Sequence, residues 1–242
     1  MSVAFWFGLA CMSPVVMPQA KRTRRTALRL PEACGSDNGQ WGSGAAQRRL
    51  LVLGDSVAAG VGVADHQQGL ACQLARSRHR INNETVAWHT RGINGARLAD
   101  LLLALPDMAL PASIDTLIIS IGVNDTTALT RRHAFRQQLT ELQTQLDHRY
   151  PGIPVHLMAV PPMQYFTALP QPLRALLGHR AGLIDREIQR LARQHPSRIR
   201  HLAYPALRAT ALLAEDGYHP SAEGYRCLAA AVSQRLATSQ RH

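Results

Sequence analysis

From Arg48 onward the chain alternates short apolar runs with longer stretches of helical periodicity, and this alternation constrains the fold more than any other feature. Three runs are mostly apolar along their length, as expected for strands buried on both faces of a sheet. They are Leu50 to Leu53, Thr116 to Ile121 and Val155 to Val160. Two weaker candidates are Thr85 to Thr90 and Ile199 to Tyr204, the second resembling an edge strand with one wet face. The chain therefore predicts five strands separated by helices.

The stretches between these runs carry apolar residues at steps of three or four, which is the spacing of one buried helix face. The clearest series is Phe135, Leu139, Leu142, Leu146 and Tyr150. Pro151 and Gly152 stop it, as expected at a helix end. Similar series lie before Pro106 and before Pro196, and another lies in the last helix-like stretch of the chain. We interpret these faces as core packing.

Strand–helix units joined by right-handed crossovers give an α/β fold, here a three-layer α/β/α sandwich around a five-stranded parallel sheet. We expect the flavodoxin-like strand order 2-1-3-4-5. In such sheets ligands bind beyond the carboxyl ends of the strands, near the point where the strand order reverses. The residues that follow each strand are therefore the first candidates for a functional site.

The first 46 residues differ from the rest, with an apolar opening, a basic run and then PEACGSDNGQWGSG. We expect residues 1–46 to be a disordered or processed N-terminal extension, and residues 47–242 to form one domain. Ala4 to Met12 has the apolar character of a signal-peptide core, but no positive charge precedes it and two prolines follow. Because this export signal is weak, we expect a cytoplasmic rather than an exported protein. No stretch is long and apolar enough to predict a transmembrane segment.

The formal net charge of +11 comes mainly from arginine and includes one basic cluster. Its members are Lys21, Arg22, Arg24, Arg25 and Arg29. A basic chain favours anionic partners, but nucleic-acid binders carry a recognisable module or interleaved aromatic residues, which this sequence lacks. We therefore expect no nucleic-acid partner.

The cysteines and histidines do not form metal-binding or redox motifs. The four cysteines lie far apart with no C-x-x-C pair, and the eleven histidines form no H-x-H or H-E-x-x-H arrangement. We therefore expect no metal site, no disulfide scaffold and no cofactor.

Candidate functional residues follow four of the five predicted strands. They are Ser56 in GDSVAAG, Gly95 in RGINGARL, Asn124 in IGVND, and Asp216 with His219 in EDGYHP. Taken singly, each segment has a local explanation as a helix cap or a turn. Together they supply what acyl transfer needs, namely a nucleophile, a base with its carboxylate, and donors for a developing oxyanion.

With these four blocks in this order, the chain resembles the GDSL, or SGNH, hydrolase family of serine esterases and lipases. The resemblance runs from about residue 50 to the last helix and is carried by GDSVAAG, NGA, GVND and DGYH. It implies Ser56 as nucleophile, His219 as base and Asp216 as the acid that orients the base. The chain has no G-x-S-x-G elbow, so it does not resemble an α/β-hydrolase.

The resemblance also implies an oxyanion hole formed by the backbone N–H groups of Ser56 and Gly95 and the side-chain amide of Asn124. Gly92 lies close to Gly95 and competes with it for this assignment. Asp55, although next to the serine, is interpreted as a local structural residue.

We expect an enzyme that hydrolyses carboxylic esters or thioesters of small or lipid-like acyl groups through an acyl-serine intermediate, with a small-molecule ester as its substrate. An acyltransferase with the same triad is an alternative, and so is a non-catalytic domain whose basic surface binds nucleic acid or anionic lipid. PPMQYF, residues 161–166, either lines an acyl site or packs on the core. The sequence does not fix the acyl length, the leaving group or the oligomeric state.

Overall fold

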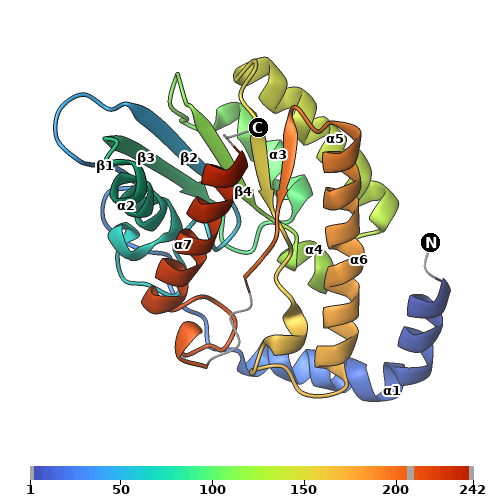
Figure 1. Cartoon of the computed structure of the whole chain (residues 1–242). Coiled ribbons are helices and arrows are strands. Elements are labelled where there is room, and N and C mark those ends of the chain that lie inside the picture. Colours follow the sequence, from blue (N-terminus) through green and yellow to red (C-terminus); the bar gives the residue numbers. More distant parts are fainter. Residues whose placement is uncertain (1–2, 206–209, 240–242) are drawn as a thin grey trace.

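The computed structural model describes residues 3–205 and 210–239 of the chain, and it contains one mixed sheet flanked by helices (Figure 1). The strands are β1 (Asn38–Trp41), β2 (Arg48–Gly54), β3 (Val86–Gly92), β4 (Thr116–Ser120), β5 (Val155–Met158) and β6 (Ile199–Leu202). The α-helices are α1 (Val3–Thr26), α2 (Leu70–Asn82), α3 (Leu98–Ala104), α4 (Val123–Thr127), α5 (Arg132–Arg149), α6 (Leu173–Gln194) and α7 (Ala222–Ser239). Short 3-10 turns are η1 (His66–Gln68), η2 (Leu105–Asp107), η3 (Met163–Tyr165) and η4 (Thr210–Leu212).

The strand order is β1-β3-β2-β4-β5-β6, and β2 to β6 pair with their neighbours in parallel. These five strands have the predicted order 2-1-3-4-5, and the predicted α/β/α sandwich is confirmed. The expected strand count was wrong, because β1 adds a sixth strand antiparallel to β3. β1 has the sequence NGQW, which is short and has Trp41 as its one large apolar residue, so periodicity gives no signal for it. Its pairing depends on the exposed edge of β3.

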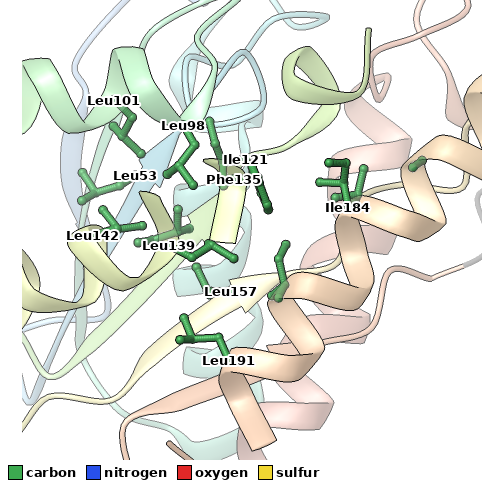
Figure 2. Close-up of a cluster of buried hydrophobic side chains, with 14 of the residues drawn as sticks. Leu53, Leu98, Leu101, Ile121, Phe135, Leu139, Leu142, Leu157, Ile184 and Leu191 are labelled. Atoms are coloured by element: carbon green, nitrogen blue, oxygen red, sulfur yellow. The ribbon is translucent and has the colours of Figure 1, made fainter. Parts of the chain in front are cut away.

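Helices cover both faces of the sheet, α2 and α7 on one and α3, α5 and α6 on the other (Figure 1). Alternate residues of β2 enter the two cores: Leu51 and Leu53 face α3, α5 and α6, whereas Leu50 and Val52 face α2 and α7. Figure 2 shows the first core, where Leu53 and Leu157 of the sheet lie among leucines of α3 and α5 and Ile184 and Leu191 of α6. Burial of both faces explains why these strands are mostly apolar.

The N-terminal segment contributes a helix as well as β1. α1 contacts α6, and Phe5 and Val16 of α1 are buried in the larger core. The expected division at residue 46, and processing of the segment before it, stay predictions. No helix among the described residues combines the length and apolarity needed to cross a membrane.

Candidate active site

Three central strands end side by side, which places the segments after them at one edge of the sheet. Gly54 of β2 is in register with Gly92 of β3 on one side and with Ser120 of β4 on the other. Ser56, Gly95 and Asn124 each follow one of these strand ends within two to four residues along the sequence. Parallel register therefore gathers the first three blocks at the carboxyl edge.

Ser56 lies in a tight turn after β2, residues 54–61, which we call the β2 turn. Asp55 N–H donates to the carbonyl of Ser120, and Val61 N–H donates to the carbonyl of Ser56. From the α7 side, the hydroxyl of Tyr225 donates to the carbonyl of Val61 at 2.8 Å. The turn is buried, and Ser56 itself is only 9% exposed.

His219 and Asp216 reach Ser56 from residues 213–220, which we call the 213–220 loop. His219 Nε2 lies 2.9 Å from Ser56 Oγ, and His219 Nδ1 lies 2.6 Å from Asp216 Oδ2. The serine is 163 positions from the histidine, so only the fold brings them together. This chain of two hydrogen bonds has the connectivity of a Ser-His-Asp triad.

The Asp216 carboxylate is held by several donors at once. Its Oδ1 accepts from the backbone N–H groups of Tyr218 and His219, while its Oδ2 faces the imidazole. Burial opposes ionisation of this carboxyl, but the hydrogen bonds from the His219 side chain and from the two N–H groups outweigh it and lower the pKa of Asp216. A carboxylate that stays charged keeps the Nδ1 proton on the imidazole and leaves Nε2 free to accept a proton.

Asn124 is hydrogen-bonded to the segment that carries Gly95. The side-chain amide of Asn124 donates to the carbonyl of Ala96 at 3.0 Å, which links the β4–α4 connection to the β3–α3 connection. Gly95 has φ +79°, and a Cβ at its position would meet open space. Among the described residues, the backbone N–H groups of Ser56 and Gly95 have no acceptor. These donors are free to face a ligand.

Asp125 has a positional role that the sequence analysis missed. It is completely buried, and its Oδ2 accepts from the backbone N–H of Leu98, the first residue of α3. From the sequence alone, the local explanation of the GVND segment was a cap for the helix that follows it. The Asp125 carboxylate instead caps α3, which belongs to another segment. The sequence signal that could have suggested this hydrogen bond is an aspartate directly after a candidate donor residue, in the segment IGVND.

Asp55 is buried beneath the β2 turn. Its Oδ1 accepts from the Val57 N–H and from the Ser120 hydroxyl, consistent with a local structural role. Burial raises the pKa of Asp55 to about 6, although these two hydrogen bonds favour the charged form. The carboxyls of the site thus differ in tendency: hydrogen bonds lower the pKa of Asp216, whereas burial raises the pKa of Asp55 and that of Asp125.

A small apolar pocket lies near these residues at the ends of β5 and β6. Its lining comprises Pro161, Pro162, Tyr165, Phe166, Tyr204 and Leu213. The ring of Phe166 also packs edge-on against Tyr218 of the 213–220 loop, with centroids 5.9 Å apart. The 161–166 segment therefore packs against the loop that carries His219, and the pocket that it lines, about 10 Å³, has room for about one water molecule. The packing interpretation of its apolar residues is favoured.

Residues 52–227, most of the chain, match the model of the GDSL-like lipase/acylhydrolase family. The chain belongs to this family. All five candidate site residues lie within the matched region. The family's description supports ester hydrolysis as the class of reaction.

Relatives agree with the family assignment. The chain is 31% identical to the GDSL-like esterase Rv1075c of Mycobacterium tuberculosis over 182 residues, which cover 73% of this chain and 57% of that protein. It thus spans a little over half of that relative's length.

Solved structures of a lipase/acylhydrolase and of an esterase share the fold. A lipase/acylhydrolase from Enterococcus faecalis is 22% identical with a TM-score of 0.55, over 80% of this chain and 97% of that one. The psychrotrophic esterase EstA from Pseudoalteromonas sp. is 14% identical with a TM-score of 0.63, over 81% of this chain and 100% of that one.

Proposed function

We propose that this protein is a serine esterase that hydrolyses carboxylic esters, with Ser56 as nucleophile, His219 as general base and Asp216 as the acid that orients His219. The observation that carries the proposal is the pair of hydrogen bonds from Ser56 Oγ to His219 Nε2 (2.9 Å) and from His219 Nδ1 to Asp216 Oδ2 (2.6 Å). Membership in the GDSL-like lipase/acylhydrolase family supports the same reaction.

In the first half of the reaction, Ser56 Oγ attacks the acyl carbon while His219 Nε2 takes the hydroxyl proton. The imidazolium that forms is stabilised by the adjacent Asp216 carboxylate. It returns the proton to the leaving alcohol as the ester C–O bond breaks, which leaves an acyl-serine. Water then attacks the acyl carbon with His219 again as base, releasing the acid and restoring Ser56.

The oxyanion of each tetrahedral intermediate would be bound by the N–H groups of Ser56 and Gly95 and by the amide of Asn124. The free N–H groups and the anchored Asn124 amide support this assignment. Gly92 is the weaker competitor, because a Cβ at its position would lie 2.1 Å from the backbone nitrogen of Ala59. That contact gives Gly92 a packing role against the β2 turn.

The substrates proposed are esters or thioesters of small or lipid-like acyl groups. We infer that the catalytic domain comprises residues 47–242, which contain the whole family match.

The test compares Ser56→Ala with Ser113→Ala, the same change at an exposed serine in the connection before β4. We expect Ser56→Ala to abolish hydrolysis of p-nitrophenyl acetate and butyrate and labelling by a fluorophosphonate, while Ser113→Ala keeps both. Equal rates in the two variants would refute the proposal. Asn124→Ala tests the oxyanion hole, and we expect kcat to fall about 100- to 1000-fold with KM little changed.

A further inference from the structure

Helix α1 has two different faces. The buried one carries Phe5 and Val16, with Leu9, Met12 and Ala20 partly buried, and packs against the core that includes α6. These residues recur at steps of three or four, the spacing of one helix face. This side of α1 is therefore already buried against the rest of the protein.

The opposite side is apolar but exposed. Phe7 is 70% exposed, Met17 64% and Val15 52%, and in the described part of the chain these are among the most exposed large apolar side chains. Leu28, just after the helix, is exposed as well. An exposed apolar group of this kind marks an interaction surface more often than a scatter of single residues does.

The same helix ends in exposed basic residues and contains no acid. These are Lys21, Arg22, Arg24 and Arg25, and Arg29 follows. They are five of the 27 lysines and arginines of the chain, and its first acidic residue is Glu32. None of the five forms an ion pair with a residue that the structure describes. Their charge is available to an anionic partner.

α1 lies along the edge of the sheet that holds the candidate active site (Figure 1). Gln19 anchors it there, with its side chain donating to the carbonyl of Gln171 and accepting from the N–H of Leu173 at the start of α6. Past this anchor, Thr23 and Thr26 line a cavity of about 220 Å³ whose other wall includes Asp216 and Tyr218. The basic end of α1 is thus a neighbour of the 213–220 loop.

We propose that the outer side of α1 binds the surface of an anionic lipid bilayer and so holds the catalytic edge against the membrane. Exposed apolar side chains enter the boundary between headgroups and acyl chains, while lysine and arginine bind anionic headgroups. The absence of acidic residues along α1 favours this partner by charge complementarity. Delivery of lipid esters to Ser56 in this way rests on the proposed esterase function, whereas the binding itself does not.

The binding test uses the full-length Ser56→Ala protein, with its intact N-terminus verified by mass spectrometry, so that lipids are not consumed. Flotation with phosphatidylcholine vesicles is compared with flotation after phosphatidylglycerol has been added to them. We expect binding only to the anionic vesicles. A protein that stays unbound, or that binds both vesicle types equally, would overturn the proposal, and self-association through α1 without vesicle binding would do the same.

A matched pair of variants locates the surface. Lys21→Gln, Arg22→Gln and Arg25→Gln together remove three charges from α1, and Arg186→Gln, Arg190→Gln and Arg193→Gln remove three exposed charges from α6. We expect the α1 variant to lose at least about tenfold in vesicle affinity and the α6 variant to lose less than about twofold. Equal losses would show that diffuse charge rather than α1 mediates binding.

Activity separates this proposal from the proposed function. With Ser56 intact, the α1 variant should hydrolyse soluble p-nitrophenyl acetate like the wild type but hydrolyse esters embedded in anionic vesicles at least about fivefold more slowly. A normal rate on embedded esters would refute a role for α1 in substrate access. Inactivity of the wild type on all esters, together with α1-dependent vesicle binding, would instead refute only the esterase.

Discussion

The β2 turn and the 213–220 loop supply the two halves of the proposed triad, yet they are held in different ways. The β2 turn is tied to elements from across the domain: Asp55 N–H bonds to Ser120 of β4, the Thr90 hydroxyl of β3 donates to Ala58 at 2.6 Å, and Tyr225 of α7 donates to Val61. The nucleophile is therefore positioned by the fold itself.

The 213–220 loop is held largely by its own residues. Ala214 N–H donates to the carbonyl of His219, and Gly217 N–H donates to the carbonyl of Ala214. Asp216 Oδ1 closes the loop further by accepting from Tyr218 and His219. Changes in the β2 turn should therefore lower stability, whereas changes in the 213–220 loop should lower activity with a much smaller effect on stability.

Asp216→Asn should have the largest effect, and mainly on activity. The amide oxygen can keep the two backbone hydrogen bonds of Oδ1, which places the NH2 group against His219 Nδ1. The imidazole must then accept at Nδ1 and carry its proton on Nε2, so it cannot take the proton of Ser56. We expect kcat for p-nitrophenyl butyrate to fall about 10⁴-fold. The urea midpoint should fall only slightly, because the lowered pKa of Asp216 makes its charged form stabilising.

Glu215→Gln is the matched control, because it makes the same chemical change at an exposed neighbour in the same loop. It should retain the wild-type rate. Activity of Asp216→Asn within tenfold of the wild type would mean that this carboxylate does not set the tautomer of His219.

Gly92→Ala should have the largest effect on stability. The added methyl would lie 2.1 Å from the backbone nitrogen of Ala59 and 2.6 Å from the carbonyl oxygen of Asp55, and neither atom belongs to a flexible side chain. The β2 turn would have to separate from β3, so we expect a loss of about 3 kcal/mol or more in the free energy of unfolding, measured with urea.

Gly182→Ala serves as the control for Gly92→Ala. A Cβ at Gly182, in α6, meets open space, so the same change should be neutral or stabilising by up to about 1 kcal/mol. A wild-type midpoint for Gly92→Ala would show that the β2 turn is not rigidly packed and does not differ in this respect from the 213–220 loop.

Asp55→Asn tests the β2 turn by pH. The pKa of Asp55 is raised from 3.8 to about 6 by burial, so between these values the folded protein holds a proton that the unfolded chain releases. This group therefore lowers the free energy of unfolding as pH rises through that window, by about 2 to 3 kcal/mol in full. The amide cannot ionise, so the stability of Asp55→Asn relative to the wild type should rise by this amount from pH 4 to pH 7.

Urea unfolding at intervals of one pH unit measures the difference for Asp55→Asn. Asp100→Asn provides a contrast of opposite sign, because hydrogen bonds from Arg97 lower the pKa of Asp100. That variant should lose a little stability relative to the wild type as pH rises. A difference between Asp55→Asn and the wild type that does not change with pH would refute a buried, weakly acidic Asp55.

The sequence could predict the central strands and the site residues after them, but not β1 or the hydrogen bond between Leu98 and Asp125. β2 and β4 are buried on both faces, so their apolar runs gave the sheet and its carboxyl edge, and short polar residues after them marked the site. β1 could not be predicted because its pairing depends on the edge of β3 and its four residues include one large apolar side chain, that of Trp41. The hydrogen bond from the Leu98 N–H to Asp125 was not predicted for a related reason, since it joins segments 27 residues apart through one carboxylate.

Gly217→Ala should have the smallest effect, and it tests whether the 213–220 loop yields independently of the domain. Gly217 has φ +70°, and a Cβ would lie 3.0 Å from both Ala168 Cβ and Thr167 Oγ1. A left-handed backbone costs a non-glycine residue about 1 to 2 kcal/mol, so the loop should relieve part of this strain by shifting. Because His219 would move with it, we expect kcat to fall while the free energy of unfolding, measured with urea, drops by no more than about 1 kcal/mol. A loss of stability as large as that of Gly92→Ala, with kcat unchanged in the folded fraction, would show that the loop is as rigidly built into the fold as the β2 turn.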